Sequence, residues 1–244
     1  MLKRAYVASL RAVRPIAAQI GLLDALERRA EASRGALWLR SLFAIYDIED
    51  MAALDLPWWT LAGVEEADRF LKSRSSARVF EYGSGASTLW LARRAASVVS
   101  IEHDSPWYDI VSKRLAGHGN ATVRLIEADA KTVPGYVSEK DGWEGRSFRQ
   151  YASAIDGEHG QFDLIVVDGR ARPACLAHAV KKLAPDGMIL FDNSSRNRYR
   201  KAIAASGLAA RTYRGMTACL PYPDETTVLR PRAVSSQPAQ VGQA

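Results

Sequence analysis

The stretch VFEYGSGAST, residues 79–88, decides the fold of this chain. It has the pattern of a short apolar strand, a loop that contains Gly83 and Gly85, and a helix that begins near Ser87 or Thr88. Glycine lets the backbone approach a ligand closely, and the first turn of a helix presents N–H groups that have no intrahelical partner. The stretch therefore predicts a βα unit whose loop faces a nucleotide-like ligand.

Similar units follow along the chain and predict an α/β fold. Apolar runs alternate with helical stretches, which is typical of a mainly parallel sheet. FDLIVVDG (162–169) is apolar from Leu164 to Val167 without alternation, so this strand belongs in the middle of the sheet. Two β-rich runs near the end, separated by PYPD, predict an antiparallel hairpin at one edge. The expected architecture is a Rossmann-like, seven-stranded, mainly parallel sheet with helices on both faces.

The chain divides into three predicted parts. Residues 1–54 form an N-terminal helical appendage, residues 55–232 the main domain and residues 233–244 a disordered tail. In the appendage, apolar residues recur at helical spacing, and Pro15 is expected to open a second helix. A composition of 48% hydrophobic and 25% charged residues is typical of a globular protein.

The N-terminal helices carry a basic charge, with eight basic and three acidic residues among positions 1–40. Three hypotheses follow: packing on the main domain, packing on a second subunit in a homodimer, and peripheral contact with an anionic membrane surface. No apolar run approaches the roughly 20 residues of a membrane span. The two cysteines form no CxxC pair, so we expect a reducing, cytoplasmic location.

Acidic residues at the ends of the next two strands suggest how a nucleotide would be held. Glu102 ends the second strand, where a carboxylate can accept hydrogen bonds from both ribose hydroxyls. Asp129 ends the third predicted strand and would meet an adenine amino group. The alternatives are a solvated strand end for Glu102 and a helix cap or turn for Asp129. A dinucleotide motif would need glycine at position 88, and Thr88 argues against NAD or FAD.

The order and spacing of these segments resemble the class I S-adenosylmethionine-dependent methyltransferases. The series EYGSGAS, SIEHD, EAD, VVDGR and APDGMILFDN carries the resemblance, from Ala77 to about Asn193. It implies S-adenosylmethionine as the cofactor. By this resemblance, the methionine part of the cofactor would contact Glu81, Gly83, Gly85 and Ser87. The ribose would contact Glu102, and the adenine would lie beside His103 and Asp129.

The ends of the fourth and fifth predicted strands indicate the reaction site. Asp168, Asp192 and Asn193 lie there, at the edge where α/β sheets bind ligands. They resemble the metal-binding trio of catechol-type O-methyltransferases, and their oxygens would suit Mg²⁺. The alternative is that they are ordinary strand-end turn residues. We take the three as candidate catalytic residues and candidate metal ligands.

Arginines flank the same edge and suggest an anionic acceptor. Arg170 follows the fourth strand and Arg196 the fifth, and guanidinium groups there would bind phosphate, sulfate or carboxylate. The alternative is a solvated, charged helix surface. The insert between Lys131 and Gln161 carries Trp143, Phe148 and Tyr151, which are interpreted either as a lid over the acceptor or as core.

These observations predict a methyltransferase that methylates an oxygen atom of a small molecule or glycan, such as a phosphorylated or acidic sugar. A nucleic-acid methyltransferase is an alternative, but DGRARP (168–173) stands where amino-methylating enzymes carry [DNS]PP[YFW]. A non-catalytic nucleotide-binding or regulatory protein on a methyltransferase fold is another alternative. A dehydrogenase is disfavoured by Thr88.

Overall fold

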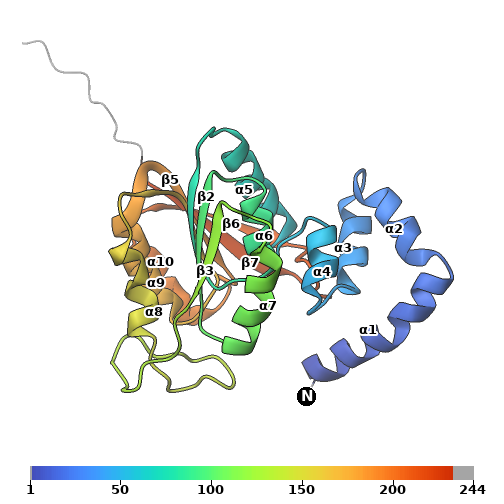
Figure 1. Ribbon diagram of the computed structural model, residues 1–244, viewed down its shortest axis with the longest axis horizontal. Coiled ribbons are helices and arrows are strands. Elements are labelled where there is room, and N and C mark those ends of the chain that lie inside the picture. Colours follow the sequence, from blue (N-terminus) through green and yellow to red (C-terminus); the bar gives the residue numbers. More distant parts are fainter. Residues whose placement is uncertain (1, 233–244) are drawn as a thin grey trace, which may run out of the picture.

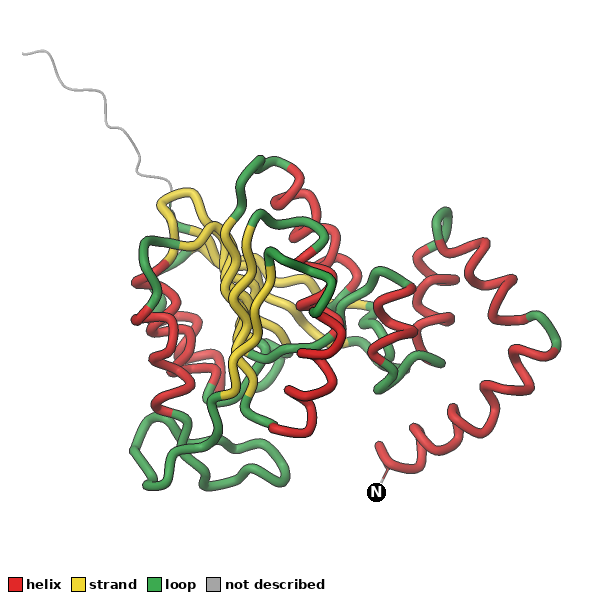
Figure 2. Tube along the Cα trace, viewed as in Figure 1, coloured by secondary structure: helices red, strands yellow, loops and turns green. Residues whose placement is uncertain are grey.

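The computed structural model describes residues 2–232, so the predicted disordered tail lies outside the described residues. Within them, seven strands form one sheet in the order β3-β2-β1-β4-β5-β7-β6 (Figures 1 and 2). The first five strands are parallel, and β7 pairs antiparallel with both β5 and β6. The predicted fold class and the edge hairpin are confirmed. The strands are β1 (Arg78–Tyr82), β2 (Ser97–Glu102), β3 (Ala121–Leu125), β4 (Phe162–Val167), β5 (Leu183–Asp192), β6 (Ala209–Gly215) and β7 (Asp224–Arg230).

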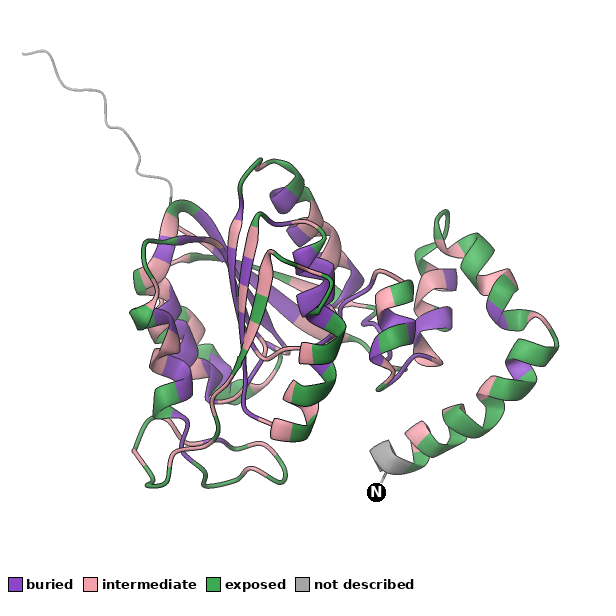
Figure 3. Cartoon of the chain, viewed as in Figure 1, coloured by how far each residue is buried: buried purple, intermediate pink, exposed green. Residues whose placement is uncertain are grey.

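Helices cover both faces of the sheet, and the central strands are buried on both sides (Figure 3). In β4, Leu164 and Val166 pack toward α5 and α6, whereas Ile165 and Val167 pack toward α8 and α9. This alternation explains why the strand is apolar at every position from Leu164 to Val167. The covering elements are α5 (Leu61–Lys72), α6 (Ala86–Ala92) and α7 (Ser105–Leu115) on one face, and α8 (Arg149–Ser153), η1 (Ala154–Gly157), α9 (Arg172–Lys182) and α10 (Asn197–Ala205) on the other.

Four helices precede α5: α1 (Leu2–Gln19), α2 (Leu22–Ala30), α3 (Arg34–Leu42) and α4 (Ile48–Ala53). The prediction that Pro15 opens a second helix is wrong, because α1 continues through it. The break comes instead at Gly21, whose φ of 70° lies in the left-handed region that glycine adopts at low cost. The amide of Ile20 still bonds the carbonyl of Ile16, so the helix persists to that glycine.

The helices α3 and α4 share their cores with the main domain. Met51 and Ile45 are buried with Leu61 of α5 and with Cys219 of the β6–β7 loop. Ile48 is buried against residues of α6 and α7. The boundary predicted at residue 54 therefore falls within a shared core, and only α1 and α2 extend away from the sheet (Figure 1).

The outer side of α1 carries an exposed apolar stripe. Val13, Ile16 and Ile20 are 49–71% exposed and lie at helical spacing on one side. Among the described residues, no helix is long and apolar enough to cross a membrane. Contact of these helices with a membrane surface or with a second subunit stays a prediction.

Candidate functional site

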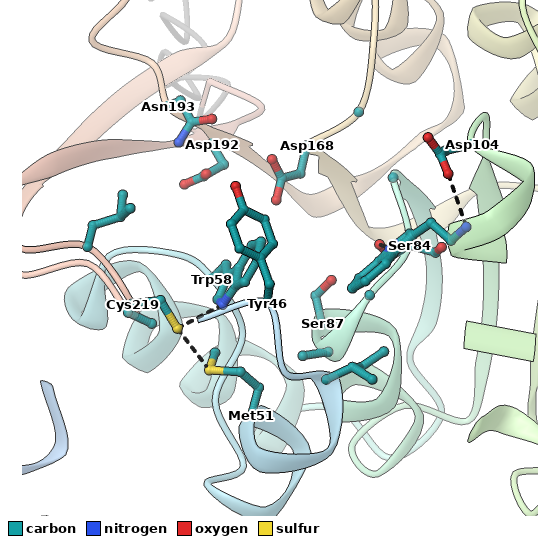
Figure 4. A pocket seen from close by; sticks show the side chains of 18 of the residues that line it. Tyr46, Met51, Trp58, Ser84, Ser87, Asp104, Asp168, Asp192, Asn193 and Cys219 are labelled. Carbon is teal, nitrogen blue, oxygen red and sulfur yellow. Dashed lines mark hydrogen bonds between the residues drawn. The ribbon is translucent and has the colours of Figure 1, made fainter. Parts of the chain in front are cut away.

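A cleft of about 480 Å³ opens at the edge where β1, β2, β4 and β5 end (Figure 4). This volume suits a nucleotide-sized ligand together with a small second molecule. One part, the Gly83 half, is lined by the loops after β1, β2 and β4. The other part, the Tyr46 half, is lined by the segment around α4, the end of β5 and the β6–β7 loop.

Gly83 needs to be glycine for two independent reasons. Its φ is +94°, which L residues rarely adopt. A Cβ at this position would also lie 3.0 Å from the backbone of Gly169, on the loop after β4. The two loops thus approach each other closely, and both line the Gly83 half.

The buried carboxylate of Glu81 organises this loop from behind. Its Oε2 accepts hydrogen bonds from Thr88 Oγ1 at 2.6 Å and from Ser100 Oγ at 2.7 Å. Thr88 Oγ1 in turn accepts from the amide of Gly85 at 2.9 Å. Desolvation raises the pKa of Glu81 to about 7, against the opposing effect of hydroxyl donors that include Ser87. Glu81 does not line the cleft, so the structure places it beneath the predicted contact with methionine.

Glu102 lies at the end of β2, is 2% exposed and lines the cleft. Its Oε2 accepts from the amide and hydroxyl of Ser84 at 3.0 and 2.9 Å. Its Oε1 accepts from the amides of His103 and Asp104 at 2.7 and 3.0 Å. Desolvation opposes ionisation, but His103 and these backbone donors hold the pKa of Glu102 below its usual value. An ionised acceptor therefore faces the Gly83 half.

His103 is fixed by polar contacts on both ring nitrogens. Nδ1 lies 2.7 Å from Glu102 Oε1, and Nε2 accepts from Arg170 Nε at 2.9 Å. The edges of three aromatic rings of the insert surround the imidazole at centroid distances of 4.7–6.0 Å. Two of these rings are fully buried in the core, which favours the core interpretation of the insert over the lid. The three are Trp143, Phe148 and Tyr151.

Asp129 does not reach this cleft. The strand β3 ends at Leu125, four residues earlier than the predicted strand, and Asp129 lines a separate surface depression. Its carboxylate accepts from Ser147 Oγ and from the amides of Arg149 and Gln150 at the start of α8. These bonds match the cap interpretation of Asp129, and they hold its pKa below the usual value despite desolvation.

Comparison with known proteins now bears on the site. A family model described as a methyltransferase domain matches residues 80–194, from β1 to just beyond β5. Residues 80–194 therefore form an S-adenosylmethionine-dependent methyltransferase domain. No curated protein matches the chain in sequence.

Several solved structures are similar to this chain at low sequence identity. The structure described as precorrin 8w decarboxylase from Methanobacterium thermoautotrophicum gives a TM-score of 0.50 and 16% identity, over 69% of this chain and 89% of that chain. N-methyltransferase NodS from Bradyrhizobium japonicum gives 0.45 and 14%, over 70% and 85%. A methyltransferase-like protein from Silicibacter pomeroyi gives 0.43 and 22%, over 68% and 86%.

The Gly83 half of this methyltransferase fits S-adenosylmethionine. The backbones of Gly83 and Gly169 line this half and approach each other so closely that a Cβ on Gly83 has no room, and an ionised Glu102 lines the same space. The indole of Trp107 lies beside Gly85 and donates to the carbonyl of Ser84 at 2.8 Å. Of the predicted cofactor residues, five line the cleft: Gly83, Gly85, Ser87, Glu102 and His103.

Two carboxylates meet between the halves of the cleft. Asp168 follows β4 and Asp192 ends β5, and both side chains point toward the cleft (Figure 4). Arg172 joins the two strand ends: it donates to Asp168 Oδ1 at 2.6 Å and to the backbone carbonyl of Asp192. Thr226 Oγ1 donates to Asp192 Oδ1 at 2.8 Å.

Burial makes this carboxylate pair hard to ionise fully. Desolvation raises the pKa of Asp168, against the attraction of Arg172. Desolvation and then repulsion by Asp168 raise the pKa of Asp192 well above its usual value. The pair therefore retains a proton to higher pH than free carboxylates do. The side chain of Asp168 is 23% exposed, so it is the member that solvent and ligands can reach.

The predicted trio does not fit a magnesium site. The side-chain amide of Asn193 is already engaged: its nitrogen donates a hydrogen bond to Asp224 Oδ2 at 2.9 Å, and its oxygen accepts one from Arg196 at 3.3 Å. The guanidinium of Arg172 already compensates the charge of Asp168. Among the described residues, no group of three or more His, Cys, Asp or Glu side chains is arranged to hold a metal ion.

Both predicted substrate arginines line the cleft. Arg170 lies beside His103 in the Gly83 half, and Arg196 lies beside Asn193 and Tyr199 at the end of β5. The structure thus brings the two guanidinium groups to the same opening, on the side of the carboxylate pair.

Sequence reasoning did not identify the Tyr46 half. Tyr46 and Met51 come from the segment that was assigned to an appendage, and Cys219 and Tyr222 come from the loop of the hairpin. They share no short motif, because residues more than 160 positions apart form this wall. The cluster of aromatic residues around Trp58 and the proline-containing PYPD loop were the available signals.

Proposed function

We propose that this methyltransferase transfers a methyl group to a hydroxyl oxygen of a small anionic molecule, with Asp168 as the general base. The observation that carries the proposal is the carboxylate pair with raised pKa values at the centre of the cleft. S-adenosylmethionine, when bound, supplies an electrophilic methyl group on a sulfonium, whose C–S bond breaks as the new C–O bond forms.

The residues of the chain supply the general base and hold it in position. A carboxylate with a raised pKa is a stronger base than a free carboxylate, so Asp168 can accept the hydroxyl proton at neutral pH. Desolvation by burial is what keeps the proton affinity of Asp168 high. Arg172 holds the two strand ends at a fixed separation through its bonds to Asp168 and to the Asp192 carbonyl. Such fixed positioning is itself a large part of catalysis by group transfer.

The charge of the acceptor is inferred from Arg170 and Arg196. Both line the opening of the cleft, and guanidinium groups bind carboxylate or phosphate through paired hydrogen bonds. An anionic group bound there would leave the rest of a small acceptor close to Asp168. Replacing Arg196 by Ala should raise the KM of the acceptor and leave cofactor binding intact.

The proposal is tested by the release of S-adenosylhomocysteine from S-adenosylmethionine in the presence of hydroxyl-bearing anions. The panel contains hydroxybenzoates, uronic acids and sugar phosphates, each with its uncharged analogue. With the best acceptor, Asp168→Asn should lower kcat by about 10²–10⁴-fold, because the base is lost. Binding of S-adenosylhomocysteine, measured by calorimetry, should be unchanged.

The matched control is Asp163→Asn. Asp163 lies on the same strand β4 but at its opposite end, where it pairs with Arg74. Its replacement should leave kcat within about twofold. Activity on a nucleic acid or a protein but on none of the anions, or full activity of Asp168→Asn, would contradict the proposal.

A further inference from the structure

The Tyr46 half of the cleft is built by segments outside the matched methyltransferase domain. Its wall consists of the segment that leads into and through α4, the aromatic pair before α5, and the β6–β7 loop. The residues are Ile45, Tyr46, Met51, Trp58, Cys219 and Leu220. Whatever is methylated must lie against this wall, because the Gly83 half is the cofactor side.

The N-terminal helices hold the β6–β7 loop in place. Ser41 Oγ on α3 accepts from the amide of Cys219 at 3.0 Å, and the indole of Trp38 donates to the carbonyl of Leu220 at 2.9 Å. From α1, the hydroxyl of Tyr6 donates to the carbonyl of Cys219 at 3.3 Å. The wall is therefore a single packed unit, and the helices α1 and α3 are part of its support.

Backbone strain concentrates at this wall. Among the described residues, five other than glycine have a positive φ, and three of them line the cleft. These are Tyr46 at 58°, Asn193 at 49° and Cys219 at 63°. Conformations of this kind cost free energy and persist where surrounding structure enforces them, often at ligand sites.

The wall has few groups that could hydrogen-bond a ligand. The indole nitrogen of Trp58 lies 2.9 Å from the sulfur of Cys219, and that sulfur contacts Met51, so these polar atoms are directed at each other. Other polar residues that line this half are Tyr222, Asp47, which pairs with Arg14, and Asp224, which accepts from Asn193 and Ser195. The rest of the surface is aliphatic or aromatic, with the Tyr46 ring packed edge-on against Trp58 at 5.0 Å. A sugar carries a hydroxyl on most carbons and would lose hydrogen bonds to water against such a surface.

Polar groups lie along one edge of this apolar surface. Tyr46 extends toward Asp168 and Asp192 (Figure 4), and Arg196 donates to Asn193, the residue that follows Asp192. The geometry points to an acceptor with a flat apolar body whose hydroxyl and acidic group both lie on that edge. We propose that the acceptor is an aromatic hydroxycarboxylic acid whose ring lies against Tyr46 and Trp58. This inference rests on the proposed function, and it replaces the acidic sugar expected from the sequence.

The test uses the three isomeric hydroxybenzoates as probes, with glucuronate as the matched sugar acid. Each is titrated into the full-length protein saturated with S-adenosylhomocysteine. At least one hydroxybenzoate should bind at submillimolar concentration, and glucuronate at least tenfold more weakly. Tyr46→Ala should weaken hydroxybenzoate binding by about tenfold, because an aromatic contact is lost, and Tyr46→Phe should retain binding. Tyr108→Ala, a half-buried tyrosine of α7 outside the cleft lining, is the matched control.

Two results would overturn the inference. One is tighter binding of glucuronate than of every hydroxybenzoate, or binding of no hydroxybenzoate at millimolar concentration. The other is hydroxybenzoate binding that is unchanged in Tyr46→Ala. Failure of the proposed function itself is seen separately, as an inability of the wild-type protein to bind S-adenosylhomocysteine or as full activity of Asp168→Asn.

Discussion

At the scale of single residues, carboxylates at neighbouring strand ends differ in charge state because their donors differ. Glu102 receives four hydrogen bonds from Ser84, His103 and Asp104, so it stays ionised although it is buried. Glu81 is equally buried but receives hydroxyl donors on one oxygen, and among the described residues its Oε1 has no hydrogen-bond partner. Desolvation therefore prevails and raises the pKa of Glu81 to about 7.

This difference predicts how protein stability depends on pH. The folded state binds a proton at Glu81 more tightly than the unfolded state does, whose glutamate has a pKa near 4.5. The stabilisation of the folded state by the proton on Glu81 is fully present below pH 4.5 and is lost as the pH rises through about 7. Glu81→Gln removes this titration, and its amide oxygen can still accept from Thr88 and Ser100.

We expect the free energy of unfolding of Glu81→Gln, relative to wild type, to rise by about 2–3 kcal/mol between pH 5 and pH 8. Urea unfolding of both proteins at a series of pH values measures this. A difference that is constant over the range would show that Glu81 is ionised in the folded protein at pH 5.

At the scale of elements, buried ion pairs join the N-terminal helices to one another. Arg40 of α3 is 4% exposed and binds both oxygens of Asp50 on α4. Its Nε also donates to Glu27 of α2 at 2.7 Å, and Arg14 of α1 contacts Asp50 at 2.9 Å. Because Asp50 is the shared partner, the orientation of α1, α2 and α3 depends on α4, which leads into the cleft wall.

Removing the central arginine should loosen these helices without affecting the cofactor half. Arg40→Ala leaves Asp50 buried with only part of its charge compensated, which should lower the free energy of unfolding by about 3 kcal/mol. Hydrogen exchange should accelerate in α1–α4, and the affinity for S-adenosylhomocysteine should change by less than about threefold. Arg34→Ala is the control on the same helix, since its pair with Glu65 is exposed and should contribute less than about 1 kcal/mol. Equal effects of the two substitutions would contradict this account of the network.

How far the sequence predicts the elements depends on the range of the interactions involved. The central strands are predictable because burial on both faces makes consecutive residues apolar, as from Leu164 to Val167 in β4. Gly83 is predictable because its backbone conformation excludes a side chain. The end of β3 was predicted four residues too late, because the apolar pattern continues beyond Leu125 while the chain leaves the sheet. There Asp129 caps α8 through bonds to residues about 20 positions away.

At the scale of the whole molecule, the cleft joins two parts with different origins in the sequence. The Gly83 half and the carboxylate pair come from strand ends, so local motifs predict their position at one edge of the sheet. The Tyr46 half requires Ser41 to meet Cys219 and Trp58 to meet Cys219, contacts between residues separated by more than 160 positions. Hydrophobic spacing predicts the N-terminal helices but carries no information about where they pack. The cofactor side was therefore predictable, and the acceptor wall was not.

The central claim is that the Gly83 half binds S-adenosylmethionine, and calorimetric titration of the purified protein tests it most directly. S-adenosylhomocysteine should bind with micromolar affinity and NAD should not bind. Gly83→Ala should lose at least tenfold in affinity, because the new Cβ would need a positive φ and would crowd Gly169. Gly117→Ala, where a Cβ meets nothing within 4 Å, should bind as wild type does. A folded protein that binds NAD, or that binds S-adenosylhomocysteine equally well with Ala at position 83, would contradict the account.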